Sequence, residues 1–270
     1  MFQEKVVVIT GAGSGIGRAL AIQFAKAGAR LAISDINESG LAETLQLLPS
    51  QAPARVRSYG LDATSWEGFV AHAEEVKRDF GTAHVIINNA GATVVGTVEH
   101  TSIEEFRWQL DINMYGVLYG TKAFMPMMLT QREGWIVNIS SIFGMLSFPT
   151  QSAYNMSKFA VRGLTECLWQ ELEGTGVQAV CVHPGGIKTN IEKAGRRVKL
   201  AGKDEDKFAD QAAQMLRTSP DECAADIIRG MRQGQRRIMT GYMSRTVFWL
   251  TRLMPNRYPT LLKWFTKEAA

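Results

Sequence analysis

The sequence predicts an α/β fold: a single doubly wound, mostly parallel sheet of seven strands with helices on both faces. Short β-branched runs alternate with amphipathic stretches of helical length along most of the 270 residues. The runs are apolar almost throughout, which is typical of strands that are covered on both faces of a parallel sheet. Right-handed crossovers between parallel strands then give a doubly wound fold, in which ligands are expected at the carboxyl ends of the strands.

Seven apolar runs predict the strands: residues 6–10, 31–35, 56–61, 85–87, 135–139, 178–182 and 237–239. Helices are expected over residues 15–26, from the second strand through residue 48, and over residues 65–80. Neither an internal repeat nor an interdomain linker interrupts this alternation. We therefore expect one Rossmann-type catalytic domain over residues 1–242, followed by a basic amphipathic extension over residues 243–270. The irregular residues 186–216, which include Gly195 and Gly202, are expected to form a flap beside the ligand cleft.

Charge is distributed unevenly along the chain. The formal net charge is +4, but residues 229–270 hold nine Lys or Arg and only one acidic residue, Glu268. This tail therefore carries +8 and the first 228 residues carry −4. A mildly acidic body disfavours nucleic acid as a partner.

Cysteine, histidine and the N-terminus indicate the compartment. Cys167, Cys181 and Cys223 form no CxxC pair and no cluster with histidine, so we expect reduced, mostly structural thiols and no metal site. The N-terminus leads directly into a strand without a secretory signal pattern, and no run of 18 apolar residues occurs. These features predict a cytoplasmic protein.

A glycine-rich turn joins the first predicted strand to the first predicted helix. It reads Thr-Gly-Ala-Gly-Ser-Gly-Ile-Gly over residues 10–17. Glycine lets the backbone turn tightly and approach a pyrophosphate, while the helix N-terminus supplies N–H groups and partial positive charge. The turn therefore predicts a dinucleotide site that includes Gly11, Ser14, Gly15 and Ile16.

Asp35 ends the second predicted strand, 18 residues beyond Gly17. A carboxylate there accepts hydrogen bonds from the adenosine ribose and repels a 2′-phosphate, which favours NAD over NADP. Two alternatives remain open. Asp35 is also suited to cap the next helix, and Arg18 is able to attract a phosphate.

Tyr154 and Lys158 place a phenol and an ammonium on one face of a predicted helix. A neighbouring cation favours the phenolate and so makes tyrosine a better acid/base near neutral pH. Ser141 lies 13 residues before Tyr154, just after the fifth predicted strand. Its hydroxyl and the phenol are therefore expected to converge on one substrate oxygen. The alternative is that Ser141 caps a turn and that Tyr154 packs in the core.

The set resembles the short-chain dehydrogenase/reductase (SDR) family over about residues 5–190. The matching positions are residues 10–17, Asp62, Asn88, Asn89, Ala90, Gly91, Asn113, Ser141, Tyr154, Lys158, Pro184, Gly185 and Thr189. Each match alone is weak, but together, in order and at compatible spacing, they are specific.

The resemblance implies a role for each catalytic position. Tyr154 would be the general acid/base, and Ser141 would hydrogen-bond the substrate oxygen. Lys158 would lower the pKa of Tyr154 and bind the nicotinamide ribose, and Asn113 would hold a water that passes protons toward Lys158.

The resemblance also extends the cofactor site beyond the glycine turn. Asp62 would face the adenine, and Ile187 and Thr189 would meet the carboxamide. The full set of predicted cofactor-binding residues is Gly11, Ser14, Gly15, Ile16, Asp35, Asp62, Ala63, Asn89, Ala90, Gly91, Tyr154, Lys158, Pro184, Gly185, Ile187 and Thr189.

The C-terminal extension departs from the Val-Asp-Gly-Gly type ending of many tetrameric family members. Val247, Leu250 and Met254 recur at helical spacing among basic residues, and a second apolar group includes Leu261 and Trp264. Aromatic and basic residues together suit peripheral contact with an anionic membrane. The alternative is that this face packs on the body as a lid or dimer seam. We expect a homo-oligomer, either a dimer or a tetramer.

The leading functional prediction is hydride transfer between NAD(H) and a secondary alcohol or ketone, with a lipophilic substrate. This prediction rests on Ser141, Tyr154, Lys158 and Asn113 together with the apolar loop over residues 142–149. An NADP-dependent carbonyl reductase is the alternative within the same class. A non-catalytic dinucleotide-binding sensor is the alternative from a different class.

Overall fold

The computed structural model describes residues 1–50, 52, 55–189, 191, 195–203, 205, 208 and 214–261. Parts of the predicted flap and of the C-terminal extension lie outside these residues. The second apolar group of the extension lies outside the described residues beyond Leu261, so the contacts predicted for it are not described.

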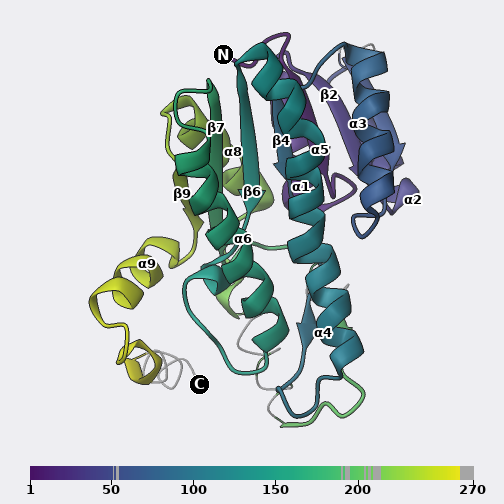
Figure 1. Cartoon of the computed structure of the whole chain (residues 1–270). Helices are drawn as coiled ribbons and strands as arrows, with labels where there is room; N and C mark the ends of the chain where they lie inside the picture. The colour runs from purple at the N-terminus through teal and green to yellow at the C-terminus, as the bar shows by residue number, and fades with distance from the viewer. Residues whose placement is uncertain are drawn as a thin grey trace.

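One parallel sheet organises the described chain (Figure 1). Its strands are β1 (Val6–Thr10), β2 (Arg30–Asp35), β3 (Val56–Gly60), β4 (Val85–Asn88), β6 (Gly134–Ile139), β7 (Val177–Gly185) and β9 (Arg237–Gly241). They lie in the order β3-β2-β1-β4-β6-β7-β9, and every pair is parallel. The predicted seven-stranded doubly wound fold is therefore confirmed. The strand order reverses between β1 and β4, the point at which such sheets open a ligand crevice.

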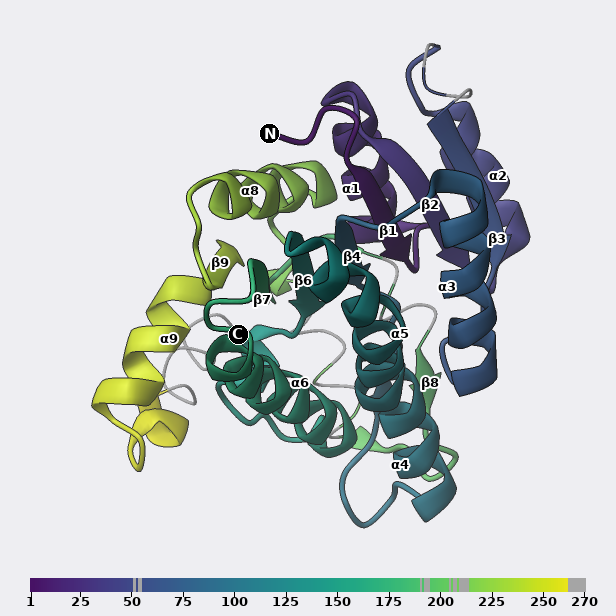
Figure 2. The ribbon, with the colours of Figure 1, turned by 45° about the horizontal axis from the view of Figure 1, so that its top comes forward.

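Helices cover both faces of the sheet, as Figure 2 shows. One layer holds α1 (Gly15–Lys26), α2 (Glu38–Gln46) and α8 (Pro220–Arg232), and the other holds α3 (Trp66–Phe80), α5 (Gly116–Gln131) and α6 (Ser152–Glu171). Each layer buries its own apolar cluster against the sheet. Alternate side chains of one strand enter different clusters: Val7 and Ile9 face the first, and Val6 and Val8 face the second. This arrangement explains why the strands are apolar at every position.

Several elements were not predicted from the sequence. Helix α4 (Ile103–Leu110) starts at a capping box formed by Ser102 and Glu105, and a π-helical turn (Asp111–Tyr115) joins it to α5. A small second sheet pairs β5 (Val94–Val95) with β8 (Arg196–Arg197). Its two strands are about a hundred positions apart along the chain, so no local pattern indicates their pairing.

The described part of the extension begins with α9 (Ser244–Leu253), which lies beside β9 (Figure 1). Its inner residues, Val247 and Phe248, pack on the apolar loop that follows β6, including Met145 and Leu146. This described part of the extension packs on the body, which agrees with one of the two alternatives expected. Among the described residues, no helix combines the length and the apolar character needed to cross a bilayer.

Candidate active site

A cleft of about 710 Å³ opens at the carboxyl ends of the strands. Its walls come from the turn after β1, the ends of β2, β4 and β6, the start of α6 and the segment after β7. The sheet topology thus places the glycine turn and the Ser141/Tyr154/Lys158 set in a single cleft.

The glycine turn forms the floor of this cleft. Gly11 has a φ of +67°, and a Cβ atom there would lie 2.8 Å from the Cα of Ala90. Asn89 ties the turn to the end of β4, because its Nδ2 donates to the carbonyl of Thr10 at 3.0 Å. Ser14, the N-cap of α1, makes no side-chain capping hydrogen bond. The first N–H groups of α1 are therefore not satisfied by the cap residue and suit an anionic group.

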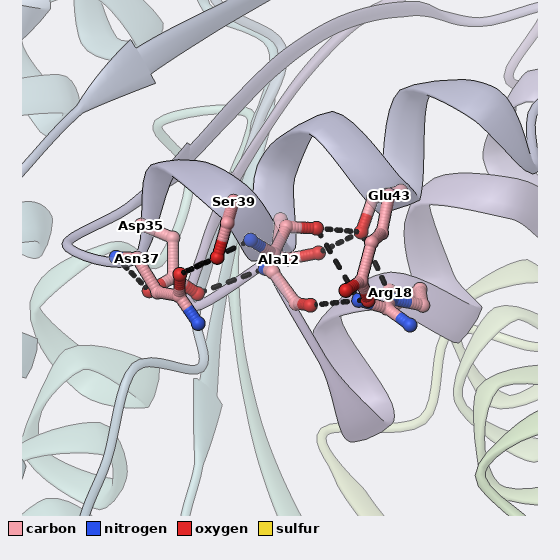
Figure 3. Close-up of polar contacts among 9 residues, drawn as sticks. Ala12, Arg18, Asp35, Asn37, Ser39 and Glu43 are labelled. Atoms are coloured by element: carbon pink, nitrogen blue, oxygen red, sulfur yellow. Dashed lines mark hydrogen bonds and ion pairs between the residues drawn. The ribbon is translucent and has the colours of Figure 1, made fainter.

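Asp35 lies at the end of β2 with its carboxylate against the glycine turn (Figure 3). Its Oδ2 accepts from the N–H of Gly13 at 2.8 Å, and its Oδ1 accepts from the N–H of Asn37 at 2.9 Å. Asn37, and not Asp35, caps α2 by accepting from Gly40. The capping alternative for Asp35 is therefore wrong. Each carboxylate oxygen still has lone pairs for a ribose hydroxyl.

Arg18 has partners of its own near the glycine turn (Figure 3). Its guanidinium donates to the carboxylate of Glu43 at 2.8 Å, to the hydroxyl of Thr44 at 3.0 Å and to the carbonyl of Gly13. These contacts brace α1 against α2 and neutralise the charge. Arg18 is thus engaged in holding two helices together, which leaves less of its hydrogen-bonding capacity for a phosphate.

Tyr154 and Lys158 lie one turn apart on α6 and both line the cleft. The Nζ of Lys158 is 5.5 Å from the centroid of the Tyr154 ring. The Phe143 ring also contacts the Tyr154 ring, edge-on, with the ring centroids 5.9 Å apart. The spacing of Tyr154 and Lys158 along the sequence therefore does bring the ammonium beside the phenol.

Lys158 is 3% exposed and its Nζ donates to the carbonyl of Ile139 at 3.0 Å. Burial lowers the pKa of Lys158 to about 8, because the charged form loses hydration that one carbonyl replaces only in part. At pH 7 the ammonium form still dominates, so the cleft holds a buried positive charge next to Tyr154.

Ser141 follows β6 and is the N-cap of a short 3₁₀ helix (Ile142–Gly144). Its Oγ accepts from the N–H of Phe143 at 3.1 Å. Because that contact uses an oxygen lone pair, the hydroxyl hydrogen remains available for a substrate oxygen.

Asn113 is fully buried in the π-helical turn. Its Oδ1 accepts from the N–H of Ala92 at 2.9 Å, and its Nδ2 donates to the carbonyl of Ala92 at 2.9 Å and to Ser157 at 3.2 Å. The side chain therefore joins the loop after β4 to α6. Asn113 does not line the cleft, and its expected role toward a proton-carrying water stays a prediction.

The structure brings most of the predicted site residues together. The predicted residues that line the cleft are Gly11, Ser14, Gly15, Ile16, Asp35, Asp62, Ala63, Asn89, Ala90, Gly91, Ser141, Tyr154, Lys158, Pro184, Ile187 and Thr189. Gly185 is not among the lining residues. A Cβ atom at Gly185 would lie 2.5 Å from the carbonyl oxygen of Tyr242, so this glycine permits close packing beside the cleft.

The sequence indicated the apolar loop after β6, of which Ile142 and Phe143 line the cleft, but not the other apolar walls. These walls, here called the apolar end of the cleft, include Trp108, Ile112, Phe208 and Leu216. The guanidinium of Arg196 in β8 lies 3.8 Å from the centroid of the Trp108 ring. Phe208 and Leu216 do fall within the predicted flap, but Trp108 belongs to an unpredicted helix and no motif marks it.

A doubly wound parallel sheet with this glycine turn at its switch point defines the Rossmann-type class of dinucleotide-binding folds. The family described as "short chain dehydrogenase" matches residues 5–199. The chain belongs to the short-chain dehydrogenase/reductase family.

Relatives and solved structures agree with this assignment. The protein named "Putative oxidoreductase SadH" from Mycobacterium tuberculosis is 43% identical over 265 residues, which cover 97% of this chain and 95% of the relative. A short-chain dehydrogenase/reductase from Burkholderia phymatum, crystallised with NAD, has a TM-score of 0.82 at 33% identity, covering 88% of this chain and 89% of the other. A short-chain dehydrogenase from Streptomyces avermitilis has a TM-score of 0.83 at 28% identity, covering 98% and 97%.

Proposed function

We propose that this oxidoreductase transfers a hydride between NAD(H) and a secondary alcohol or ketone, with Tyr154 as the general acid/base. The observation that carries the proposal is the Lys158 ammonium 5.5 Å from the Tyr154 ring, in the cleft that Ser141 also lines. The SDR membership of the chain and the NAD bound to its Burkholderia relative support the cofactor class.

The residues present fit a nicotinamide dinucleotide. The pyrophosphate would lie against Gly11, which has no side chain, and against the start of α1, where Ser14 makes no side-chain capping hydrogen bond. Asp35 would accept the adenosine ribose hydroxyls, and Thr189 would lie at the nicotinamide end. The bound nicotinamide supplies the hydride chemistry.

The protein's own contribution is to hold a proton and a substrate oxygen in place. In the direction of ketone reduction, Tyr154 donates its phenolic proton to the substrate oxygen as the carbonyl carbon is reduced. Ser141 donates a hydrogen bond to the same oxygen and stabilises its developing charge. The positive charge of Lys158 favours the phenolate that this step leaves behind. In alcohol oxidation, the phenolate takes the proton instead.

The apolar end of the cleft supports a lipophilic substrate. Trp108, Ile112 and Leu216 line it, and Phe208 closes against Phe148 with ring centroids 5.7 Å apart. These walls offer few hydrogen-bonding partners for a polar chain. A ketone with an aromatic or extended alkyl substituent therefore suits this space better than a sugar or a hydroxy acid.

NAD is the preferred cofactor in this proposal, because a carboxylate at Asp35 repels a 2′-phosphate and Arg18 is engaged with Glu43. The alternative is an NADP-dependent carbonyl reductase. Loss of the Asp35 charge would favour this alternative.

Turnover of a panel of ketones tests the proposal. Acetophenone, 2-decanone and cyclohexanone are offered with NADH and with NADPH, and absorbance at the nicotinamide band is followed. We expect reduction of at least one ketone, faster with NADH. Dinucleotide binding without turnover of any ketone or of the matching alcohols would contradict the proposal and favour a non-catalytic sensor.

A homo-oligomer is proposed from the outer surface of α5 and α6, which lie side by side in Figure 2. Tyr115, at the end of the π-helical turn that leads into α5, and Met156 and Phe159 on α6 are exposed, with relative exposures of 41%, 53% and 39%. Light scattering coupled to gel filtration is expected to show a dimer or tetramer, and Phe159→Glu is expected to weaken it. A monomer at micromolar concentration would contradict this. The free cysteines Cys167, Cys181 and Cys223 support a cytoplasmic location in this proposal, because the cytoplasm keeps thiols reduced.

Peripheral membrane contact is proposed for the outer face of α9. Trp249 and Leu253 are 58% and 73% exposed there beside Arg245 and Arg252, and no acidic residue lies between Tyr242 and Leu261. Such a face suits an anionic lipid surface. Sedimentation with phosphatidylglycerol vesicles is expected to exceed that with phosphatidylcholine vesicles, and to fall in a Trp249→Gln/Leu253→Gln variant. Equal sedimentation of the variant and the unmodified chain would contradict this contact.

A further inference from the structure

A buried histidine lies directly behind Ser141. His183 is on β7 and is fully buried. Ser140 donates its N–H to the carbonyl of Val182 at 2.8 Å, which continues the pairing of β6 with β7. At the next residue, Ser141, the contact between the two segments involves a side chain: the Nδ1 of His183 lies 3.0 Å from the carbonyl oxygen of Ser141. Because a carbonyl oxygen only accepts, this contact requires the hydrogen on Nδ1.

The other ring nitrogen of His183 faces Arg237, the first residue of β9. The Nη1 of Arg237 lies 3.3 Å from Nε2, and since a guanidinium only donates, Nε2 accepts. Both contacts therefore select the same neutral tautomer. Burial, with Arg237 and Arg162 acting in the same direction, lowers the pKa of His183 to about 4, although the Ser141 carbonyl and Glu166 oppose this shift. The ring is neutral at the pH of any ordinary assay.

Arg237 continues the network to the helix that bears the catalytic tyrosine. Its Nη2 donates to the Oε1 of Glu166 on α6 at 2.6 Å. The guanidinium also lies 5.1 Å from the Trp169 ring centroid and 5.6 Å from that of Phe248 on α9. A chain of contacts thus runs from Ser141 through His183 and Arg237 to α6.

We propose that His183 is a positioning residue that fixes the Ser141 hydroxyl relative to Tyr154. The carbonyl and the side chain of Ser141 share one Cα, so holding the carbonyl restricts the direction of the hydroxyl. Glu166 lies on the same helix as Tyr154, so this network connects Ser141 to the helix that carries Tyr154. A misplacement of about 1 Å at a reacting group lowers turnover by up to about a hundredfold. The inference rests on the proposed function, because Ser141 must act on a substrate oxygen.

Two substitutions separate positioning from simple space filling. His183→Leu removes both ring nitrogens. His183→Asn restores the hydrogen-bond donor to Ser141, because the amide nitrogen Nδ2 of asparagine is as many bonds from Cβ as the Nδ1 of histidine. With the panel ketone that the unmodified enzyme reduces fastest, we expect His183→Leu to lower kcat about tenfold or more at an unchanged Kd for NADH. His183→Asn is expected to recover most of this loss.

His72→Leu is the matched control. His72 on α3 is 2% exposed and, like His183, has a pKa lowered by burial to about 4. Neither of its ring nitrogens has a hydrogen-bond partner among the described residues, and it does not line the cleft. The same substitution there is expected to leave kcat unchanged for the folded fraction, which NADH fluorescence titration measures.

A double-mutant cycle with Ser141→Ala decides whether His183 acts through Ser141. In the Ser141→Ala background, His183→Leu is expected to change kcat by less than about twofold, because the hydroxyl to be positioned is absent. An equal tenfold loss in both backgrounds would overturn the inference while leaving the proposed function intact. An unchanged kcat in His183→Leu, or no recovery in His183→Asn, would also overturn it. If Ser141→Ala itself has no effect, the proposed function fails and the inference fails with it.

Discussion

The two ends of the cleft are built differently. The dinucleotide end is built around the backbone of the glycine turn: Gly11 approaches Ala90 so closely that a Cβ atom there would lie 2.8 Å from the Cα of Ala90, and α1 begins without a side-chain cap. The substrate end is made of side chains from distant segments, among them Trp108 of α4 and Phe208 of the predicted flap. The dinucleotide end depends on the absence of side-chain atoms in the glycine turn, whereas the substrate end depends on which side chains are present.

This difference indicates how each end tolerates change. The glycine turn cannot adjust to an added side-chain atom, because the main-chain atoms that it would contact are held in place by the sheet. A side-chain surface adjusts its shape with each substitution. We therefore expect substitutions at the dinucleotide end to act on all substrates alike and substitutions at the substrate end to act selectively. The following predictions test this contrast.

Tyr154→Phe is expected to have the largest effect. Loss of the phenolic proton removes general acid/base catalysis, so turnover falls by about 10²–10⁴-fold. The apolar ring remains against Phe143, so the Kd for NADH in a fluorescence titration stays within about threefold of the unmodified value. Near-normal turnover in steady-state kinetics would refute the assignment of Tyr154.

Gly11→Ala is expected to weaken NADH binding by about a hundredfold or more, which corresponds to about 3 kcal/mol. The added Cβ meets backbone at Ala90, and the φ of +67° adds strain of about 1–2 kcal/mol. Isothermal titration calorimetry measures the affinity.

Gly234→Ala is the matched control for Gly11→Ala. Gly234 also has a φ of +67°, but nothing lies within 4 Å of the Cβ position. It is expected to lose stability by a similar strain while binding NADH normally. If both variants bind NADH equally well, the backbone surface is more adaptable than proposed.

Asp35→Asn is expected to lower the preference for NAD over NADP about tenfold in kcat/KM, an effect of about 1.4 kcal/mol. The amide removes the charge that repels a 2′-phosphate but keeps an oxygen to accept from Gly13. Asp35→Ala loses both, so it is expected to reduce NAD turnover further. An unchanged cofactor ratio in Asp35→Asn would mean that another group selects the cofactor.

Phe208→Ala is expected to raise KM for 2-decanone about fivefold, with little change for a small ketone and none in the Kd for NADH. Phe208 is 7% exposed and packs on Phe148 at the apolar end. Burial of a phenylalanine side chain contributes about 1.5–3 kcal/mol. The alkyl chain of bound 2-decanone would lose its contact with the Phe208 ring but would recover part of this free energy by occupying the space that the ring leaves. Equal effects on both ketones would contradict a side-chain surface that selects among substrates.

The remaining prediction concerns stability: Lys158 makes the free energy of unfolding depend on pH. Its folded-state pKa of about 8 lies below its ordinary value of 10.5, so between these values the unfolded chain holds a proton that the native protein has lost. Stability therefore rises with pH in this window, by at most about 1.4 kcal/mol per pH unit.

Urea unfolding at pH 7.5 and 9.5 measures this rise as a difference from Lys158→Met. Cys181 and Cys223, whose pKa values are raised by burial to about 12, oppose the rise above pH 9 in both proteins, so the difference removes most of their contribution. Equal slopes for the two proteins would show that Lys158 does not titrate as expected.

Sequence alone predicted the features that local rules control. A buried parallel strand, a glycine turn such as the one at Gly11, and one helical turn between Tyr154 and Lys158 each depend on a few neighbouring residues, and each was found as expected. The strand β7 extended three residues beyond its predicted end because β9 pairs with it up to Gly185.

Only the tertiary structure decided which distant residues meet. Arg196 on Trp108, Asn113 on Ala92 and His183 on Ser141 all join segments that no periodicity connects. Each of these contacts depends on the packing of whole elements, in which a shift of one residue in register or one turn of a helix selects a different partner. The sequence therefore determined the chemistry of the proposed catalytic pair, Tyr154 and Lys158, and the packing determined which residues surround it.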